Sequence, residues 1–455
     1  SRFDRVLFIT SLATLPYLVY GSMLGIFIVL VRLIWRHRSP CLDPLTRNCL
    51  GLIALLLLMS ALDAYRPGEA FLQLANFWPY MLLFAYLPGL LRQLETLENL
   101  AIALVLSSIP INLIAIGEFI LKAPFFPQPW RSIPWIEAVR KAPHRGRAMA
   151  MFDHPNVMAS YLVIVLGLAV GLLVMQMAYG TTHRRRIHVW SRQKGDRPQS
   201  LSDPALLPQD AQFSPGFSSS VLLPCAVGLL LVGIFCTGSR NGLAIALSQL
   251  IVFGLASRAN RKILAMIAAV IGVGAIAIAT VGLGTRPMGI FDFTDDPRVG
   301  IWAIAVDLIR ERPWLGWGLG NFKFLYPARL IDPTYTDIFH AHNIWLLLGS
   351  EAGIPVMIAM SVFVGFMCYR VARVCLGDMH LTFGRFLKKA SVVTVDGAIP
   401  DSGVPKRAIA LGYLLAFWGC LGFALLDITF YDVRVNALNW TLLAALYVLP
   451  YEETR

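Results

Sequence analysis

The stretch Phe339-His340-Ala341-His342-Asn343-Ile344-Trp345-Leu346 joins two parts of the chain that differ in character. Residues 285–339 mix polar, aromatic and glycine residues, and after the stretch the chain turns apolar over a membrane-length run. His340 and His342 are therefore expected where a water-exposed segment meets a bilayer. Imidazole titrates near neutrality and suits proton transfer at such a boundary, whereas a purely interfacial role would only anchor a helix. Position alone leaves both interpretations open.

The composition is that of a membrane protein. The chain has 455 residues, of which 57% are hydrophobic and only 15% are charged, against about 25% charged residues in a typical soluble protein. Long apolar runs recur from end to end, which predicts an all-α polytopic membrane protein. The net charge of +12 then reflects basic cytoplasmic loops beside anionic lipids and gives no indication of nucleic-acid binding. The seven cysteines form no CxxC pair, so neither a disulfide framework nor a zinc site is predicted.

The apolar runs predict the number of spans. The first run, residues 6–35, is long enough for one tilted helix or for a hairpin that breaks near Gly21-Ser22. The later runs are residues 50–62, 71–91, 100–121, 157–177, 221–236, 243–255, 263–283, 344–371, 408–426 and 435–449. The chain therefore has about eleven spans, or about twelve if the first run is a hairpin.

The basic clusters favour the hairpin. Lys and Arg gather near residues 36–47, 184–197, 258–262 and 370–407, and Arg2 and Arg5 lie at the start. All of these lie on one side, the cytoplasmic side, only if the first run crosses twice. The predicted organisation has about nine transmembrane helices in residues 1–284, with an outer basic loop 122–156 and a cytoplasmic loop 180–220. A large outer loop 285–342 with short helices follows, and then about three transmembrane helices in residues 343–455 with a cytoplasmic loop 377–405.

The outer loop 122–156 is basic, which is unusual on the translocated side. Its cations include Arg131, Arg140, Arg145 and Arg147. A bound phosphate would explain them, because the planar guanidinium donates two parallel hydrogen bonds; lipid headgroups or acids of the large loop are the alternative partners. Arg147 is favoured because its segment leads directly into a helix start at Pro155-Asn156, where unpaired N–H groups attract anions.

Two further stretches place arginines on the outer side. Cys236-Thr237-Gly238-Ser239-Arg240-Asn241-Gly242-Leu243 is a tight turn between spans, so Arg240 is a site candidate unless it only snorkels to the surface. Arg298 opens a helical pattern that is expected to lie on the membrane surface. The turn Pro313-Trp314-Leu315-Gly316-Trp317-Gly318 offers aromatic platforms that suit sugars, although interfacial anchoring by tryptophan explains them equally well.

In this order, the motifs resemble the O-antigen ligase family, within the superfamily of O-antigen polymerases and bacterial protein O-oligosaccharyltransferases. The resemblance covers roughly residues 145–355, and the flanking spans match only in hydropathy. The residues that carry it are Arg147 with Phe152-Asp153-His154-Pro155-Asn156, Gly238-Ser239-Arg240-Asn241-Gly242, Arg298-Val299-Gly300-Ile301-Trp302, Gly316-Trp317-Gly318-Leu319-Gly320-Asn321, His340-Ala341-His342-Asn343 and Glu351-Ala352-Gly353-Ile354-Pro355.

The resemblance implies a GT-C-like, inverting glycosyltransferase of the bacterial inner membrane that uses no nucleotide, metal or other cofactor. It would act at the periplasmic face among membrane lipids, and transfer glycan from undecaprenyl diphosphate to the lipid A–core oligosaccharide in lipopolysaccharide biosynthesis. The family's histidine corresponds to His342, and His340 beside it shares the prediction of a catalytic role. The family's basic residues correspond to Arg147 and Arg240, and we add Arg145 and Arg298 as predicted contacts of the diphosphate.

The residues support this chemistry independently. Displacement of diphosphate from a sugar carbon needs cations at the leaving group and a base at the acceptor hydroxyl. The chain has no DxD motif; the acidic run Asp292, Asp295 and Asp296 is interpreted as solvated surface or as a partner for arginines. A protein O-oligosaccharyltransferase or an O-antigen polymerase would use the same donor and remains the main alternative. A transporter or flippase is disfavoured because the notable charges lie near outer ends and no inverted repeat is recognised.

Overall fold

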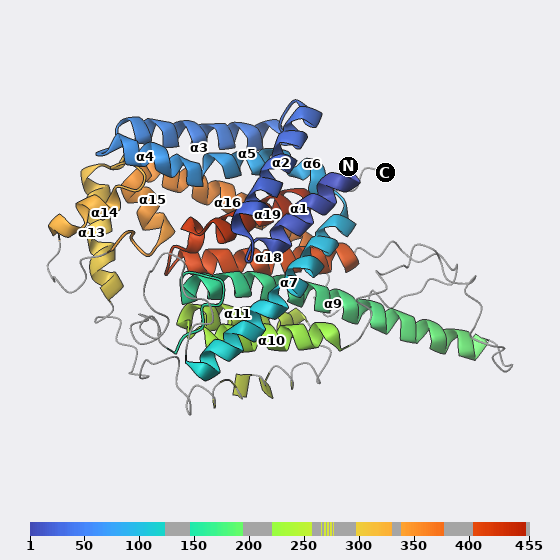
Figure 1. The fold of residues 1–455 in the computed structure, drawn as a ribbon. Coiled ribbons are helices and arrows are strands. Elements are labelled where there is room, and N and C mark those ends of the chain that lie inside the picture. Colours follow the sequence, from blue (N-terminus) through green and yellow to red (C-terminus); the bar gives the residue numbers. More distant parts are fainter. Residues whose placement is uncertain are drawn as a thin grey trace.

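The computed structural model describes residues 1–122, 146–193, 221–256, 297–329, 338–376 and 404–451, together with a few positions of 265–276. In these residues the regular structure is helical (Figure 1). The elements are α1 (Arg2–Thr14), α2 (Val19–His37), α3 (Pro44–Leu62), α4 (Pro67–Gln73), η1 (Leu74–Asn76), α5 (Trp78–Tyr86), α6 (Pro88–Leu91), α7 (Leu94–Leu121), α9 (Pro155–Gln193), α10 (Leu222–Cys236), α11 (Arg240–Ala256), α13 (Pro297–Glu311), α14 (Phe322–Leu325), η5 (Pro327–Arg329), α15 (Ile344–Ala352), α16 (Ile354–Leu376), α18 (Val404–Ala424), η7 (Thr429–Tyr431) and α19 (Val433–Val448).

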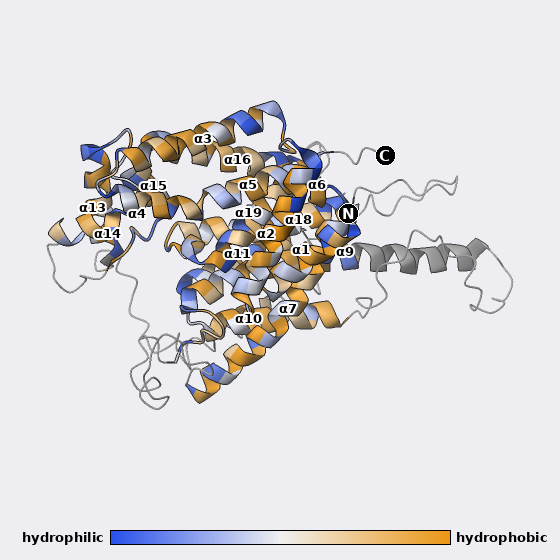
Figure 2. Ribbon diagram, turned by 45° about the horizontal axis from the view of Figure 1, so that its top comes forward, coloured by the Kyte–Doolittle hydropathy of each residue, from blue (hydrophilic) through white to orange (hydrophobic). Residues whose placement is uncertain are grey.

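Six helices within the described residues are long and apolar enough to cross a bilayer. They lie in α2, α3, α7, α9, α16 and α18, and α10 and α11 are shorter apolar helices. Figure 2 shows hydrophobic residues along the long helices, which supports a multi-pass membrane protein. The count of about twelve spans and the GT-C-like class stay predictions.

The N-terminal run forms two helices packed side by side. Asp4 in α1 pairs with Arg32 of α2 at 2.6 Å, and the Thr14 and Ser22 hydroxyls lie 2.9 Å apart. These pairs join the start of α1 to the end of α2 and the end of α1 to the start of α2, so the helices are antiparallel. The run therefore folds into two antiparallel helices, with its turn at residues 15–18 and not at Gly21-Ser22, which are inside α2. That both helices cross the membrane stays a prediction.

Other predicted boundaries also shift. The run 71–91 is divided among α4, η1, α5 and α6. Pro79 and Pro88 lie in the first turns of α5 and α6, where proline is tolerated because it cannot donate a backbone hydrogen bond to the preceding turn. The run 344–371 is divided at Gly353 into α15 and α16. α9 continues to Gln193, into the predicted loop 180–220. Short helices do occur in the predicted outer loop 285–342, where α13 and α14 lie.

The centre of the bundle is built by α9, α18 and α19. Gly167 and Gly171 of α9 let the backbone of α18 approach closely: a Cβ at Gly167 would lie 2.3 Å from the Ala416 nitrogen, and one at Gly171 would lie 2.4 Å from the Gly412 Cα. Inside a bilayer, close packing of small residues is a main source of helix association. These contacts fix two helices: Asn156 lies at the start of α9, and Asp427 follows the end of α18.

The two ends of the bundle hold different parts of the chain. At one end, Asp4 near the N-terminus pairs with Arg36 at the end of α2, and Tyr447 at the end of α19 donates a hydrogen bond to Asp43, which follows α2. The helices α13, α14 and α15 lie at the opposite end (Figure 1). This separation agrees with a topology in which both termini share one side, and the assignment of that side to the cytoplasm stays a prediction.

Candidate functional site

A line of hydrogen bonds connects Arg147 with His342. The Arg147 guanidinium donates from Nη2 to Asn156 Oδ1 at 2.8 Å. Asn156 Nδ2 donates to Asp427 Oδ2 at 2.7 Å. The other oxygen of that carboxylate, Oδ1, lies 3.2 Å from His342 Nδ1. The fold thus brings two predicted site residues together through an amide and a carboxylate.

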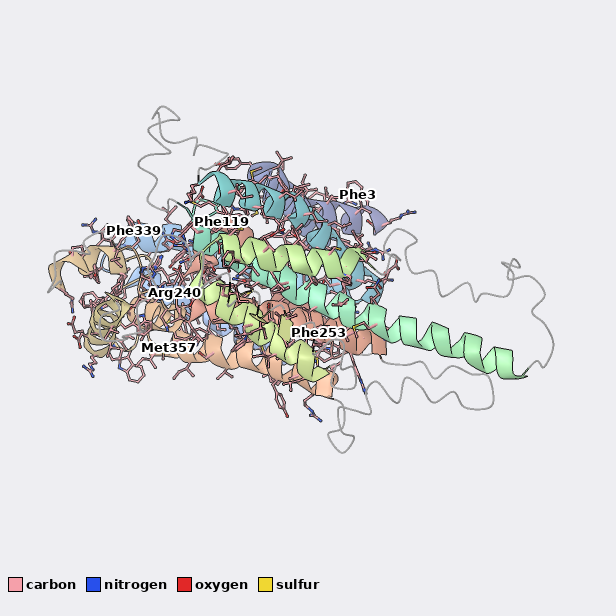
Figure 3. All side chains as sticks on the ribbon, turned by 90° about the horizontal axis from the view of Figure 1, so that it is seen from below. Phe3, Phe119, Arg240, Phe253, Phe339 and Met357 are labelled. Atoms are coloured by element: carbon pink, nitrogen blue, oxygen red, sulfur yellow. The ribbon has the colours of Figure 1, made fainter. Side chains whose placement is uncertain are left out.

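Arg147 is also attached to the turn that precedes Arg240. Its Nε donates to the Thr237 carbonyl at 2.8 Å, and the Ala148 N–H donates to the Cys236 carbonyl at 2.9 Å. Arg240 is exposed and is the first residue of α11, where the helix N-terminus favours anions. In Figure 3, Arg240 and Phe339 lie toward the same end of the molecule, away from Phe253.

The hydrogen-bond partners assign the tautomer of His342. Burial alone would raise the pKa of Asp427, but the hydrogen bond with His342 and the one from Asn156 hold it below its usual range. An ionised carboxylate only accepts hydrogen bonds, so His342 Nδ1 carries the proton and donates it to Asp427. In the neutral ring the lone pair then lies on Nε2, which makes this atom the proton acceptor.

His340 has a different environment. Its Nδ1 accepts the His342 N–H at 3.4 Å, and the two rings meet edge to face with centroids 4.5 Å apart. Burial, followed by the neighbouring His342, lowers the pKa of His340 to about 4. At neutral pH this ring is uncharged and a weak base, so the geometry favours His342 as the proton acceptor.

The backbone around His342 is unusual. His342 has φ +50°, in the left-handed region that non-glycine residues seldom adopt. The next residue, Asn343, caps α15: its Oδ1 accepts hydrogen bonds from Trp345 N and Leu346 N at 2.9 and 3.0 Å. Its Nδ2 donates to the Leu425 carbonyl at 3.0 Å, beside Asp427. Strain of this kind gathers at functional sites and needs surrounding contacts to hold it.

Two buried residues hold the segment that carries Arg147. Glu118 Oε2 in α7 accepts hydrogen bonds from Met149 N and Ala150 N, both at 2.8 Å. Arg434 in α19 donates from Nη1 to the Met151 carbonyl at 2.5 Å. The segment is therefore fixed from both sides before it enters α9.

The remaining predicted residues are placed as follows. Arg298 is partly buried in the first turn of α13, and the hydrogen bonds that join Arg147, Asp427 and His342 do not include it. Arg145 lies outside the described residues, as do Arg131, Arg140 and the acidic run at 292–296.

Sequence reasoning missed Asp427 and His154. Asp427 is 271 residues from Asn156 along the chain, and its only sequence signal is an acid at the break between two apolar runs, at the predicted outer side. His154 lies in the motif Phe152-Asp153-His154-Pro155-Asn156. Its Nδ1 accepts a hydrogen bond from the Asn156 N–H at 3.0 Å at the start of α9.

Within the described part of the chain, His340, His342 and Asp427 form a group that could hold a metal ion, with ligand atoms within 4.8 Å of one another. Imidazole and carboxylate are common ligands of zinc and related ions. The 3.2 Å separation of His342 Nδ1 and Asp427 Oδ1 is already that of a hydrogen bond. A hydrogen-bonded histidine–aspartate pair therefore explains the arrangement. Adding a metal chelator distinguishes such a pair from a metal site.

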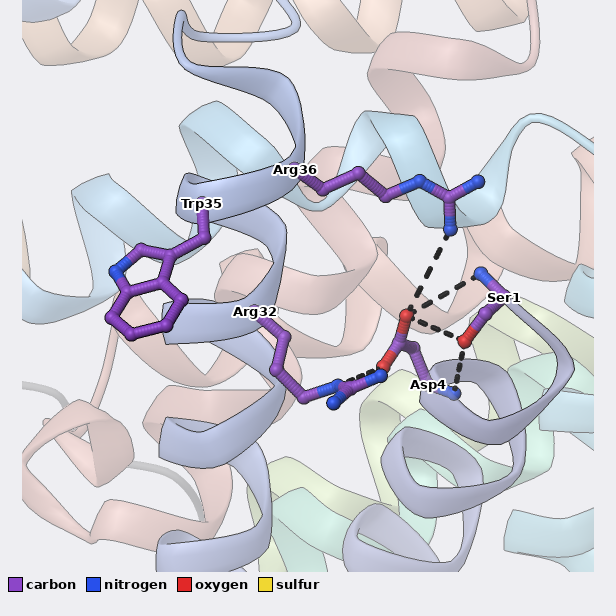
Figure 4. A pocket seen from close by; sticks show the side chains of 5 residues that line it. All are labelled: Ser1, Asp4, Arg32, Trp35 and Arg36. Atoms are coloured by element: carbon purple, nitrogen blue, oxygen red, sulfur yellow. Dashed lines mark hydrogen bonds and ion pairs between the residues drawn. The ribbon is translucent and has the colours of Figure 1, made fainter.

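A separate pocket lies at the other end of the bundle, where α1 begins and α2 ends (Figure 4). It is lined by Ser1, Asp4, Arg32, Trp35 and Arg36. Asp4 is paired with both arginines there, at 2.6 Å to Arg32 and 4.0 Å to Arg36. The pocket contains none of the predicted site residues.

The fold and the site define a helical multi-pass membrane protein with a histidine–aspartate pair and arginines at one end of its bundle. Residues 225–361 match a protein-family model described as O-Antigen ligase. The resemblance that the motifs indicated is thereby confirmed, and it indicates an enzyme of the glycosyltransferase type. The match includes Arg240, Arg298 and both site histidines, whereas Arg147 and Asp427 lie outside it. A search of curated proteins finds no match to the chain.

Proposed function

We propose that the protein is an O-antigen ligase that transfers a glycan from undecaprenyl diphosphate to the lipid A–core oligosaccharide. The observation that carries the proposal is the Asp427–His342 pair, which leaves Nε2 of His342 as a proton acceptor. The enzyme would lie in the bacterial inner membrane with this site facing the periplasm, among membrane lipids and without a cofactor.

In the proposed reaction, His342 Nε2 removes the proton from a hydroxyl group of the acceptor sugar. The acceptor oxygen forms a bond to the anomeric carbon of the donor glycan as the bond from that carbon to the diphosphate oxygen breaks. Attack from the face opposite the leaving group inverts the configuration, and undecaprenyl diphosphate departs with the electron pair. The proton stays on His342, where the Asp427 carboxylate stabilises the imidazolium.

Arg147 and Arg240 would stabilise the charge that develops on the diphosphate. Arg147 is preorganised, because Thr237 and Asn156 already fix its guanidinium. Preorganised cations are effective when they need no rearrangement during the reaction. Arg240 adds its charge to the N-terminus of α11 beside that turn.

A protein O-oligosaccharyltransferase or an O-antigen polymerase is the alternative, because acceptor choice does not depend on the donor-side residues. The test is to incubate the purified protein with lipid-linked glycan and one acceptor at a time. Lipid A–core, a pilin-like protein and donor alone separate ligase, protein transferase and polymerase. We expect transfer to lipid A–core only, and transfer only to another acceptor would contradict the ligase.

The same assay tests whether transfer depends on a metal ion. The proposed steps use only protein groups, so transfer is expected to continue in EDTA. Loss of transfer in EDTA that returns with an added divalent ion would instead assign His340, His342 and Asp427 to a metal centre.

A further inference from the structure

Residues 313–322 bind the junction between α15 and α16 through their backbone. The Ile354 N–H donates to the Pro313 carbonyl at 2.8 Å. The Trp317 N–H donates to the Ser350 carbonyl at 2.9 Å, and the Gly318 N–H donates to the Glu351 carbonyl at 2.7 Å. We call residues 313–322, bound in this way to residues 350–354, the clip. Two of the motifs that carry the family resemblance thus form one structural unit.

The clip requires glycine. Gly318 has φ +93°, and a Cβ there would lie 2.1 Å from the Ala64 Cβ. Gly353 has φ +90°, and a Cβ there would lie 2.2 Å from the Trp314 carbonyl oxygen. No other residue fits either position without moving the backbone.

Glu351 is a carboxyl group enclosed by the clip. Its side chain is 1% exposed, and its Oε1 accepts the Phe322 N–H at 3.0 Å. Its Oε2 has no hydrogen-bond partner within the part of the chain that the structure describes. The proposed mechanism does not use this residue.

The charged neighbours of Glu351 do not neutralise an ionised form. Lys323 of α14 is bound to Glu69 of α4 at 2.9 Å, and Glu69 itself repels a second negative charge. Tyr431 of η7 is a third titratable neighbour and is partly buried. Burial raises the pKa of Glu351 to about 7, against the opposing effect of the Gly320 and Phe322 N–H groups.

α15 connects the clip with the histidines. It has nine residues, from Ile344 to Ala352, and begins directly after the cap residue Asn343, which follows His342. Leu347 in its middle belongs to the buried cluster that also contains Ile301 and Leu308 of α13. A short rigid helix held at its C-terminal end leaves little freedom at its N-terminal end.

We propose that Glu351 is a positioning residue whose neutral carboxyl group closes the clip and thereby fixes the helix that presents His342. The part that concerns His342 rests on the proposed function, whereas closure of the clip does not. An ionised Glu351 would have to remain buried with no cation bound to it among the described residues, or open the clip to reach water.

The pH dependence has a defined sign. Glu351 is protonated more readily in the closed clip, where its pKa is about 7, than in an open one, where its ordinary value of 4.5 applies. Closure is therefore fully favoured below pH 4.5 and weakens as the pH rises to 7. The closing equilibrium changes by at most about tenfold per pH unit in that window.

The experiment measures hydrogen exchange of peptides that cover residues 313–325 in the full chain, at pH 5 and pH 8, after correction for intrinsic rates. We expect more opening at pH 8 in the wild type and no such pH difference in Glu351→Gln, which mimics the neutral acid. Glu311→Gln removes an exposed carboxylate bound to Arg329 and is expected to keep the wild-type pH dependence. Equal exchange in the wild type at both pH values would overturn the proposal.

A second variant tests the proposal if Glu351→Gln does not fold. Glu69→Gln releases Lys323 from its ion pair and removes a neighbouring negative charge, so ionised Glu351 is expected to be better tolerated in the closed clip and the extra opening at pH 8 is expected to shrink. Opening at pH 8 that equals that of the wild type would contradict the role of Glu351.

Transfer assays separate the two proposals. The wild type is expected to lose activity as the pH rises from 4.5 to 7, and Glu351→Gln is expected not to show this decline. A purely structural role would lower the activity of Glu351→Gln equally at every pH. If exchange behaves as expected and no acceptor is used, the proposed function fails and the clip stands. If transfer occurs and hydrogen exchange in the clip does not depend on pH, the clip proposal fails.

Discussion

The histidine site and the clip lie at the two ends of α15, and they use polar groups in opposite ways. At the site, side chains bond to side chains, and 27% of the His342 side chain is exposed. In the clip, backbone groups bond to one another, and glycines allow the close approach. The clip and both site histidines lie inside the segment that matches the family model, whereas Asp427 and Arg147 lie outside it.

This difference in hydrogen bonding separates motifs that hold the fold from motifs that offer groups for chemistry. Among the described residues, the buried side-chain polar atoms of the clip, apart from Glu351 Oε2, have hydrogen-bond partners, so we interpret the clip as structural. His342 Nε2 and the arginines offer a base and positive charge to a ligand. A family motif can therefore be architectural or chemical, and substitutions at the two regions should affect different measurements.

The largest effect is expected at His342. His342→Ala removes the proposed base and should lower transfer by about 10³–10⁴-fold, measured with lipid-linked glycan and lipid A–core. His340→Ala is the matched control and should cost at most about tenfold, because that ring has a low pKa and lies beside the base. Normal transfer by a well-expressed His342→Ala protein would reject the mechanism.

Asp427→Asn should have the next largest effect, about 10²–10³-fold on transfer. The amide can present an N–H to His342 Nδ1, which would favour the tautomer that carries its proton on Nε2 and cannot act as base. The thermal stability of this variant should stay near that of the wild type, because the amide keeps the shape of the carboxylate. An unchanged rate would mean that Asp427 has only a structural role.

Arg240→Ala should lower transfer by about 10–100-fold through loss of charge at the diphosphate. The rate should be measured against donor concentration, so that binding and turnover are distinguished. Arg310→Ala is the control, because Arg310 is an exposed arginine of α13 that pairs with Asp307. If Arg240→Ala changed neither quantity, Arg240 would be interpreted as snorkelling to the surface.

At the clip, Gly318→Ala should act on stability first and on transfer least. Its φ of +93° and the contact with Ala64 should cost about 2 kcal/mol or more, measured by thermal unfolding in detergent. Gly300→Ala is the control, since a Cβ there meets nothing within 4 Å and alanine favours helix. A large loss of transfer without loss of stability would give the clip a direct role in chemistry.

Much of the fold follows from local patterns. Apolar runs of bilayer length predict α2, α3, α7, α9, α16 and α18, because each helix must satisfy its own backbone in lipid. The breaks were harder to place. Gly353 divides a continuous apolar run because the clip passes over it, which hydropathy does not report.

The site shows the same division. The sequence by itself identified the arginines and histidines, because their residue types and order match a family and their predicted side of the membrane agrees. Only the tertiary structure brought in Asp427, which is 85 residues from His342 along the chain. It also distinguished His342 from His340 by their hydrogen-bond partners, and enclosed Glu351 in the clip. The physical reason is that proton affinity and charge stabilisation depend on burial and neighbours, and packing rather than local pattern sets both.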